Sequence, residues 1–219
     1  MRIRRKAWAR PELDACPFFV KQPALNRGRW AECFDNAGPL HLEVGCGKGA
    51  FIAQLALQNP DIHYLAFDIK SDMLGVARRK IVQLFGSQGK EVQNLLLSAV
   101  NVEQIETVLA PEDGISRIYI NFCNPWPREK HKKRRLTHPR QLKKYQSFLT
   151  PGGEIHFKTD DAPLFEDSVS YLEQCGFELL YRTDDLHAAG IEGNIETEHE
   201  QMFSEQGIPI HFLIAKWPG

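Results

Sequence analysis

Residues 41–49 read His41-Leu42-Glu43-Val44-Gly45-Cys46-Gly47-Lys48-Gly49, and this stretch decides the fold. A short, mostly apolar strand runs directly into a turn in which every second residue is glycine. A glycine-rich turn between a strand and a helix brings backbone N–H groups and a helix N-terminus close to a nucleotide-like ligand. Glycines at these positions remove the side chains that would block the ligand. The helix is expected over residues 50–58, where apolar residues recur at helical spacing.

Strands alternate with helices along the rest of the chain. Further helices are expected over residues 71–85, with Ser71 as N-cap, and over residues 102–109, 141–149 and 163–175. Strands are expected over residues 41–44, 62–67, 95–97, 117–122, 154–158, 177–182 and 210–215. This alternation predicts an α/β fold with a mostly parallel seven-stranded sheet and helices on both faces. The final pair of strands indicates one antiparallel member.

Length and composition point to one soluble α/β domain. The chain has 219 residues, and prolines interrupt any long helix near its start, so we expect a basic N-terminal arm over residues 1–37 and one domain over residues 38–219. There is neither an apolar run long enough to span a membrane nor a secretory signal. Five scattered cysteines without a Cys-x-x-Cys pair argue against disulfides and a metal site. A reducing cytoplasm fits these features best.

Positive charge is concentrated in two segments. Residues 1–10 hold five Lys or Arg and no acidic residue, and residues 128–144 hold nine against one acid. The rest of the chain has 13 basic and 27 acidic residues, out of totals of 27 and 28, although the formal net charge is only −1. Two basic segments on an acidic body favour binding to a polyanion. Trp8 and Trp126, which lie in or beside these segments, favour nucleic acid over a merely solvated basic face.

The glycine turn alone also fits a dinucleotide-binding protein, with Asp68 about twenty residues further on to bind ribose hydroxyls. Glu43 argues against a dinucleotide, because it places a carboxylate at the strand tip, two residues before the first glycine. A carboxylate attracts the cationic sulfonium and amino groups of S-adenosylmethionine and repels a pyrophosphate. Asp68 could alternatively cap a strand end, but the matching glycines favour the ribose role.

A basic insertion follows the strand over residues 117–122. The chain reads Asn121-Phe122-Cys123-Asn124-Pro125-Trp126-Pro127 and continues with Arg128-Glu129-Lys130-His131-Lys132-Lys133-Arg134-Arg135-Leu136. Ligands of open α/β sheets lie beyond the carboxyl ends of the strands, so we expect this segment to carry its aromatic ring and its positive charges over the methyl-donor site. Two prolines stiffen the turn that presents Trp126. The alternative is a core tryptophan beside a solvated loop.

With these motifs the sequence resembles the bacterial tRNA (guanine-N7) methyltransferases over nearly the whole chain. The Pro-Trp-Pro insertion and the late run Asn194-Ile195-Glu196-Thr197-Glu198-His199-Glu200 are the specific motifs, and Phe157-Lys158-Thr159-Asp160 and the basic arm agree with them. The resemblance implies a Rossmann-like class I methyltransferase fold. It also implies transfer of a methyl group from S-adenosylmethionine to N7 of a variable-loop guanine, position 46, in tRNA. It implies no metal and no membrane, and it leaves a homodimer open.

The resemblance also implies roles for particular residues. Cofactor contacts would come from Glu43, Gly45, Gly47, Gly49, Asp68, Asn101 and Asn124. Contacts to tRNA would come from Arg128, Lys130, Lys132, Lys133, Arg134, Arg135, Asp160, Thr197, Glu198, His199 and Glu200, and the catalytic residues would be Asn124 and Asp160. Asn101 and Asn124 stand where the family more usually has aspartate, which removes negative charge near a cationic cofactor. Arg128 replaces a lysine and adds a flat bidentate donor.

The chemistry implied for guanine N7 needs positioning more than proton transfer. N7 has an exposed lone pair and no proton at neutral pH, so it can attack the sulfonium methyl without a base. What remains is to align the reactants and to stabilise the positive charge that develops on the purine. The late acidic residues suit this task, because carboxylates accept from the N1–H and amino groups of guanine. The alternative is that Thr197 and Glu198 only cap a helix running through Met202, with Glu200 in solvent.

Two other functions remain as alternatives. Asn124-Pro125-Trp126 resembles the loop with which exocyclic-amino nucleic-acid methyltransferases hold a flipped base, although the second proline is missing. A non-catalytic tRNA-binding protein on a methyltransferase scaffold would explain the two asparagines. The intact glycine turn, with Glu43 and Asp68, argues against such a loss of the cofactor site.

Overall fold

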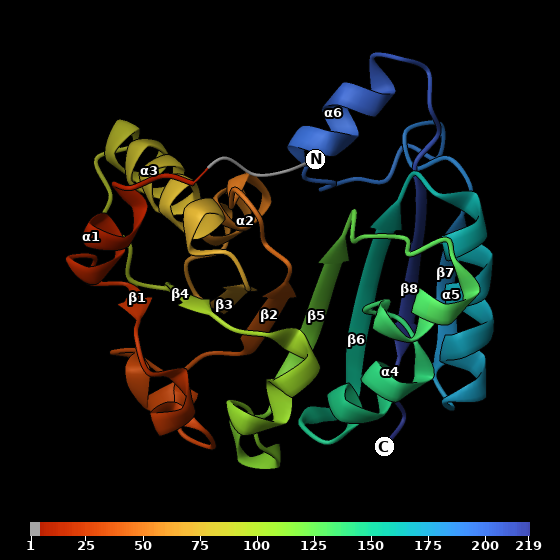
Figure 1. Ribbon diagram of the computed structural model, residues 1–219, viewed down its shortest axis with the longest axis horizontal. Coiled ribbons are helices and arrows are strands. Elements are labelled where there is room, and N and C mark those ends of the chain that lie inside the picture. The colour runs from red at the N-terminus through yellow and green to blue at the C-terminus, as the bar shows by residue number, and fades with distance from the viewer. Residues whose placement is uncertain (1–4) are drawn as a thin grey trace. The chain divides into compact units, whose positions relative to one another are not determined.

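The structure is a computed structural model that describes residues 5–219 (Figure 1). The chain divides into two units, Met1–Leu109 (unit 1) and Ala110–Gly219 (unit 2). The domain boundary predicted after residue 37 stays a prediction. Arg2 and Arg4 of the predicted basic arm lie outside the described residues. Within the described part of the chain, no helix is long and apolar enough to cross a membrane.

Unit 1 contains four parallel strands in the order β1-β4-β3-β2. They are β1 (Phe19–Val20), β2 (Leu40–Val44), β3 (His63–Asp68) and β4 (Leu95–Ala99). All residues of β2 are buried, as expected of a parallel strand in the interior of a sheet. The prediction of seven strands is wrong by one, because β1 makes the described total eight. A two-residue strand is too short to show an alternating pattern in the sequence.

The helices of unit 1 are α1 (Ala9–Asp14), α2 (Ala50–Gln58) and α3 (Ser71–Ser87), with 3-10 turns at Pro23–Asn26, Trp30–Cys33 and Val102–Thr107. The helices α2 and α3 pack against β3 and against each other, and α1 packs against α3. The predicted cap of α3 is wrong by one residue, since Lys70 is the N-cap and makes no side-chain capping bond. The described arm belongs to the core of unit 1, because Trp30 is fully buried and its indole N–H donates to the Val108 carbonyl at 2.7 Å.

Unit 2 contains β5 (Ile115–Asn121), β6 (Leu149–Thr159), β7 (Glu178–Thr183) and β8 (His211–Lys216), in the order β5-β6-β8-β7. The strands β5 and β6 are parallel, and β8 runs antiparallel to both β6 and β7. The prediction of one antiparallel strand is therefore confirmed. The helices α4 (Pro139–Gln146) and α5 (Ala162–Gln174) pack against β6 and against each other. Shorter elements are α6 (Glu198–Ser204) and 3-10 turns at Pro111–Asp113 and Glu129–Arg134.

Strand register in unit 2 brings three segments to one edge. Asn121 at the end of β5 is level with Lys158 of β6, and Thr159 of β6 is level with His211 of β8. The segment that follows β5 and the residue that follows β6 therefore emerge at the same edge. Because α6 immediately precedes β8 in the chain, it also lies at this edge, beyond the arrowheads of β5 and β6 (Figure 1).

Candidate functional site

The glycine turn of unit 1 is tied to the end of β3. The backbone N–H groups of Gly45 and Cys46 donate to the Phe67 carbonyl at 2.8 and 3.0 Å. The φ angles are 77° at Gly45, 54° at Gly47 and 70° at Gly49. These left-handed conformations favour glycine over every other residue type. The alternate glycines that predict the fold are thus needed by the turn itself.

Asp68, the last residue of β3, supports the same turn. Its Oδ2 accepts from the Gly47 N–H at 3.0 Å, and its Oδ1 accepts from the Lys70 N–H at 2.8 Å. Burial raises the pKa of Asp68, while these backbone N–H groups act in the opposite direction. Each carboxylate oxygen can accept more than one hydrogen bond. Asp68 can therefore hold the turn and still accept from the hydroxyl groups of a ribose.

Gly47 and Gly49 have different surroundings. A Cβ placed on Gly47 would meet no atom closer than 3.9 Å, so this side of the turn is open to a ligand. A Cβ on Gly49 would lie 2.7 Å from the Cβ of Ala77 in α3. The expectation that Gly49 leaves room for the ligand is therefore not met, because α3 fills that space. Gly49 instead allows α2 to pack closely against α3.

Two other side chains flank the turn. Glu43 is buried in β2, two residues before Gly45. Ile69 follows Asp68 and is 61% exposed, which is unusual for a large apolar side chain. It offers an apolar surface for a flat ring beside the predicted ribose contact. Ile69 is not among the site residues predicted from the sequence. The only sequence feature that points to it is its position immediately after Asp68, the acidic residue that ends β3.

Asn101 and Asn124 each bond to the backbone two residues further on. Asn101 caps the 3-10 turn at Val102–Thr107, where its Oδ1 accepts from the Glu103 N–H at 3.1 Å. The Oδ1 of Asn124 accepts from the Trp126 N–H at 3.2 Å. An aspartate oxygen makes the same bonds, so either residue type supports the local backbone at both positions. The two types differ there in charge.

The loop after β5 is held in an uncommon conformation. Phe122 and Trp126 have φ angles of 50° and 43°, although neither is glycine. Such values are rare for bulky residues and persist only where the surroundings enforce them. The ring centroids of Trp126 and His131 are 5.8 Å apart, and the Arg134 guanidinium lies 5.2 Å from the centroid of the Trp126 ring. Trp126 therefore packs against two side chains of the basic segment, and its expected place over the methyl donor stays a prediction.

Arg135 holds this loop from inside unit 2. Its side chain is buried, its Nε donates to the Pro125 carbonyl at 2.7 Å, and its Nη1 lies 2.5 Å from Asp167 of α5. Hydrogen bonding from Arg135 holds the pKa of Asp167 below its ordinary value, and Lys132 adds to this effect. Both guanidinium contacts are internal. A role in contacting phosphate is therefore not what the structure supports for Arg135.

The other cations of the insertion divide into two groups. Lys132 lies 3.1 Å from Glu129 and 3.2 Å from Asp167, so its charge is shared with two carboxylates. The exposed cations of the predicted tRNA-binding set are Arg128, Lys130, Lys133 and Arg134. Exposed cations are the ones that can reach phosphate groups, because they need not break an internal pair first. Four of the six predicted cations are therefore exposed, and their contact with phosphate stays a prediction.

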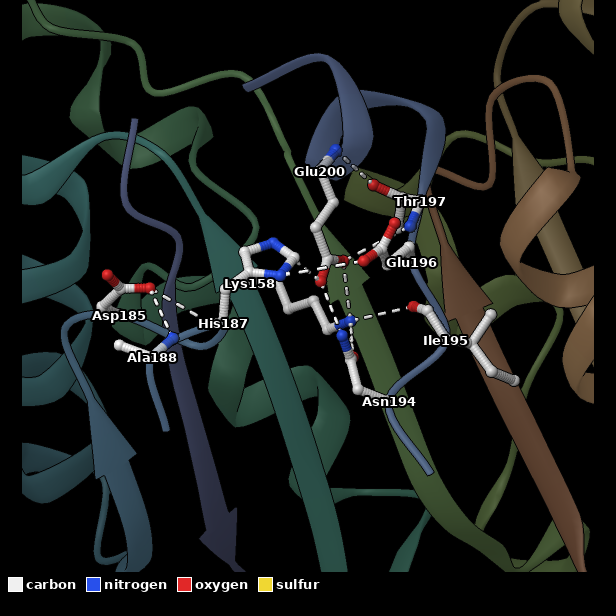
Figure 2. A network of polar contacts seen from close by, with 9 residues as sticks. All are labelled: Lys158, Asp185, His187, Ala188, Asn194, Ile195, Glu196, Thr197 and Glu200. Atoms are coloured by element: carbon white, nitrogen blue, oxygen red, sulfur yellow. Dashed lines mark hydrogen bonds and ion pairs between the residues drawn. The ribbon is translucent and has the colours of Figure 1, made fainter. Parts of the chain in front are cut away.

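The late acidic motif is built around a buried ion pair, shown in Figure 2. Thr197 is the N-cap of α6, and Glu200 completes a capping box with it. Glu200 is fully buried, and its Oε2 lies 2.9 Å from the Lys158 ammonium. The alternative in which Thr197 caps a helix is confirmed, but Glu200 is not in solvent. Its carboxylate pairs with Lys158 inside unit 2.

Three other predicted residues of unit 2 remain accessible. Asp160 is exposed at the end of β6, His199 is exposed, and Glu198 is half-buried in the first turn of α6. The His199 ring stacks on Phe122, with centroids 5.7 Å apart. The loop after β5 and the start of α6 are therefore in contact, and Asp160 follows β6 at the same edge of unit 2. These side chains can offer carboxylate and imidazole contacts to a base.

The N-terminal arm packs on α3. The Arg79 guanidinium lies 3.4 Å from the Trp8 ring centroid, and Arg79 also pairs with Glu12 of α1. Gly75 of α3 makes this approach possible, because a Cβ there would lie 2.5 Å from the Cβ of Ala9. Trp8 is thus half-buried against α3, while Arg5 and Arg10 are exposed.

Known proteins match the chain over nearly its whole length. A family described as "Putative methyltransferase" matches residues 37–213. A tRNA (guanine-N(7)-)-methyltransferase of Clostridium beijerinckii is 55% identical over 215 residues, which cover 98% of each chain. One of Acetivibrio thermocellus is 54% identical over 216 residues, or 99% of each chain. The chain belongs to the tRNA (guanine-N(7)-)-methyltransferase family. The resemblance seen in the motifs is therefore confirmed.

Solved structures show the fold of this family member. A 16S rRNA methyltransferase, KamB, has a TM-score of 0.58 at 16% identity and covers 85% of this chain and 90% of its own. A precorrin-6y C5,15-methyltransferase of Geobacter metallireducens has a TM-score of 0.55 at 14% identity, with 83% and 81% covered. At such identities the likeness concerns the fold alone. The predicted class I methyltransferase fold is confirmed.

Two residues of this family member gain a structural role that the sequence did not indicate. Asp167 anchors the basic insertion through Arg135, and Lys158 neutralises Glu200. Lys158 stands in the quoted motif Phe157-Lys158-Thr159-Asp160, but nothing in that motif predicts its pairing with Glu200. The partners of both residues are distant in sequence, and only the folded structure brings them together.

Proposed function

We propose that this chain transfers the methyl group of S-adenosylmethionine to N7 of the variable-loop guanine at position 46 of tRNA, in the cytoplasm. The observation that carries the proposal is the 55% identity, over 98% of both chains, to a relative named for this activity. The open glycine turn supports it, since that turn suits a nucleoside-like ligand. A homodimer is a further prediction, which sedimentation equilibrium of the purified chain would test.

The residues around the glycine turn fit S-adenosylmethionine. Gly45 and Gly47 let the backbone approach the ligand, and Asp68 can accept from the ribose hydroxyls. The buried carboxylate of Glu43 suits the cationic part of the molecule, and Ile69 suits the flat purine. Asn101 completes this set as an uncharged polar contact. When bound, S-adenosylmethionine supplies a methyl group whose bonding electron pair stays with the departing sulfur.

The residues of unit 2 account for binding and orientation of the RNA. Arg128, Lys130, Lys133 and Arg134 contact phosphates, which supplies affinity but little base selection. Asp160, Glu198 and His199 contact the guanine. A carboxylate that accepts from N1–H and the amino group selects guanine over adenine, which lacks that pair of donors. It also stabilises the positive charge that the purine acquires as the N7–carbon bond forms. Asn124 orients the loop through its bond to Trp126.

Mapping the methylated atom tests the proposal. Unmodified tRNA is incubated with the chain and methyl-labelled S-adenosylmethionine, and a transcript with adenine at position 46 is the control. We expect label on N7 of guanine 46, located by the chain cleavage that 7-methylguanine undergoes after reduction and aniline treatment. Label on an exocyclic amino group would instead identify the alternative methyltransferase. Binding of tRNA without any label would identify a non-catalytic protein.

A further inference from the structure

Lys158 of β6 is a lysine buried in the interior of unit 2. Its side chain is 6% exposed, and a buried ammonium is costly unless all of its protons are satisfied. Its Nζ donates to Asn194 Oδ1 at 2.5 Å, to the Ile195 carbonyl at 3.0 Å and to Glu200 Oε2 at 2.9 Å. An ammonium has three protons, so each has an acceptor. Figure 2 shows Lys158 reaching into the group formed by these residues.

Glu200 is equally committed to internal partners. Its Oε1 accepts from Asn194 Nδ2 at 2.7 Å and lies 3.6 Å from His187 Nε2. Its Oε2 also accepts from the Thr197 N–H at 3.3 Å. Its own N–H donates to Thr197 Oγ1 at 2.9 Å. The carboxylate is therefore used on both oxygens and is fully buried, which leaves it no open side toward a base.

The pair links the two elements that carry the proposed guanine contacts. Lys158 lies two residues before Asp160 at the end of β6, and Glu200 lies in the first turn of α6, beside Glu198 and His199. The side chains of Lys158 and Glu200 are 42 residues apart in the chain and form one internal contact. Asn194 bonds to both partners of the pair. A shift of either element would thus leave a buried charge without its partner.

We propose that Lys158 is a positioning residue, which fixes residues 194–200 through Glu200 so that Glu198 and His199 are held at a set distance from Asp160. This inference rests on the proposed function, because it assigns the geometry of that same base-binding group. In this arrangement Glu200 acts through α6 rather than by touching guanine. The opposite reading is an inhibitory contact in which Lys158 withholds Glu200 from the base, and it predicts opposite kinetics.

The central test compares Lys158→Met with Glu198→Gln on two substrates, tRNA with guanine and tRNA with inosine at position 46. Inosine keeps N7 and N1–H but lacks the exocyclic amino group. A residue that reads the amino group loses much of its effect on inosine. A positioning residue displaces Glu198 and His199 together, so it keeps most of its effect on both bases, which share N7 and N1–H. We expect Lys158→Met to lower kcat roughly 10-fold or more on either base, because displacements of about 1 Å can cost on the order of 100-fold. The penalty of Glu198→Gln should shrink on inosine.

Two more variants separate positioning from stability. Lys216→Met removes a lysine whose pair with Glu178 is 2.9 Å long and half-exposed, and it should leave kcat unchanged. The double variant Lys158→Met/Glu200→Met removes both buried charges, a replacement that is often neutral for folding. We expect it to melt near the unaltered chain and to keep the low kcat on both bases. A double variant with wild-type kcat would show that the pair contributes stability only.

Other outcomes also decide against the proposal. A penalty of Lys158→Met that shrinks on inosine as far as that of Glu198→Gln would overturn the positioning role, and a raised kcat would show an inhibitory contact. Hydrogen exchange gives a measurement that does not depend on activity. Amides of residues 198–204 should exchange faster in Lys158→Met than in Lys216→Met, and equal protection would overturn the proposal. Failure of the proposed function would appear separately, as an unaltered chain that methylates neither substrate.

Discussion

Arg134 and Arg135 are adjacent arginines, yet they differ in burial and in the groups that they contact. Arg134 is exposed and lies over the Trp126 ring, whereas Arg135 is buried between the Pro125 carbonyl and Asp167. The run of basic residues contains no sequence pattern that distinguishes the exposed arginine from the buried one. At the scale of single residues, a charge acts on RNA only if its side chain has no stronger partner inside the protein.

Substitution of each arginine should therefore have a different effect. We expect Arg134→Ala to weaken tRNA binding several-fold, with little change in melting temperature or in kcat. Arg135→Met should lower kcat and cost roughly 1–3 kcal/mol of stability, because it leaves the Pro125 carbonyl and Asp167 without their donor. Binding isotherms, turnover and thermal melting of the two variants measure this contrast. Equal losses of affinity in both, with unchanged stability, would place Arg135 on the RNA.

The asparagines allow a second test at the residue scale. Asn101→Asp keeps an oxygen for the Glu103 N–H and adds a negative charge near the predicted position of a cationic ligand. A charge pair at partial solvent exposure is worth on the order of 1 kcal/mol, so S-adenosylmethionine should bind roughly five-fold more tightly. Calorimetric titration measures the change, and Asn101→Ala is the control that loses the cap. An unaltered affinity in Asn101→Asp would remove residue 101 from the cofactor set.

At the scale of elements, the turn between β2 and α2 combines two requirements. Gly47 faces open space beside Asp68, and Gly49 faces Ala77 of α3. One glycine therefore has an open side, which the proposed function assigns to the ligand, and the other allows two helices to pack closely. The sequence presents the two as equivalent members of one motif.

Alanine at each glycine should separate these requirements. Both substitutions strain a positive φ, which costs on the order of 1 kcal/mol. Gly49→Ala also places a methyl group 2.7 Å from the Cβ of Ala77, so we expect a further loss of roughly 1–3 kcal/mol from overpacking. Gly47→Ala should melt at a higher temperature than Gly49→Ala but bind S-adenosylmethionine more weakly per folded molecule. Denaturant unfolding and calorimetry measure the two effects, and the reverse order would contradict the assignment.

At the scale of the whole molecule, charge distribution matters more than net charge. The chain has a formal net charge of −1, yet exposed cations gather on the insertion after β5. A protein of this kind should bind RNA through local counterion release, while its acidic remainder limits binding elsewhere.

The salt dependence of tRNA binding measures this footprint. Affinity should fall linearly on a plot of log K against log salt concentration. The triple variant Lys130→Ala/Lys133→Ala/Arg134→Ala should reduce the slope by roughly 2 to 3, because each phosphate contact contributes about 0.7–0.9. S-adenosylmethionine binding by this variant should be unchanged. A slope that stays the same would show that the insertion does not contact phosphates.

The sequence by itself determined seven of the eight described strands, the glycine turn and the family, although the helix expected over residues 102–109 is a 3-10 turn at Val102–Thr107. These features depend on residues close together in the chain: the apolar run of β2, the glycines after it and the acidic residue that ends β3. Local conformational preference and hydrophobic spacing depend on short stretches of sequence, so they can be recognised without a structure. The two-residue strand β1 was missed because its pairing with β4 depends on residues far along the chain.

Only the tertiary structure decided which members of each motif face outward. Arg135 is withdrawn by Asp167, 32 residues away, and Glu200 is withdrawn by Lys158, 42 residues away. Gly49 is assigned to packing by Ala77 of another helix. In each case the deciding partner is distant in the chain from the residue whose role it decides. A buried charge is costly unless hydrogen-bonding or oppositely charged groups lie close to it, and such distances exist only once the chain is folded.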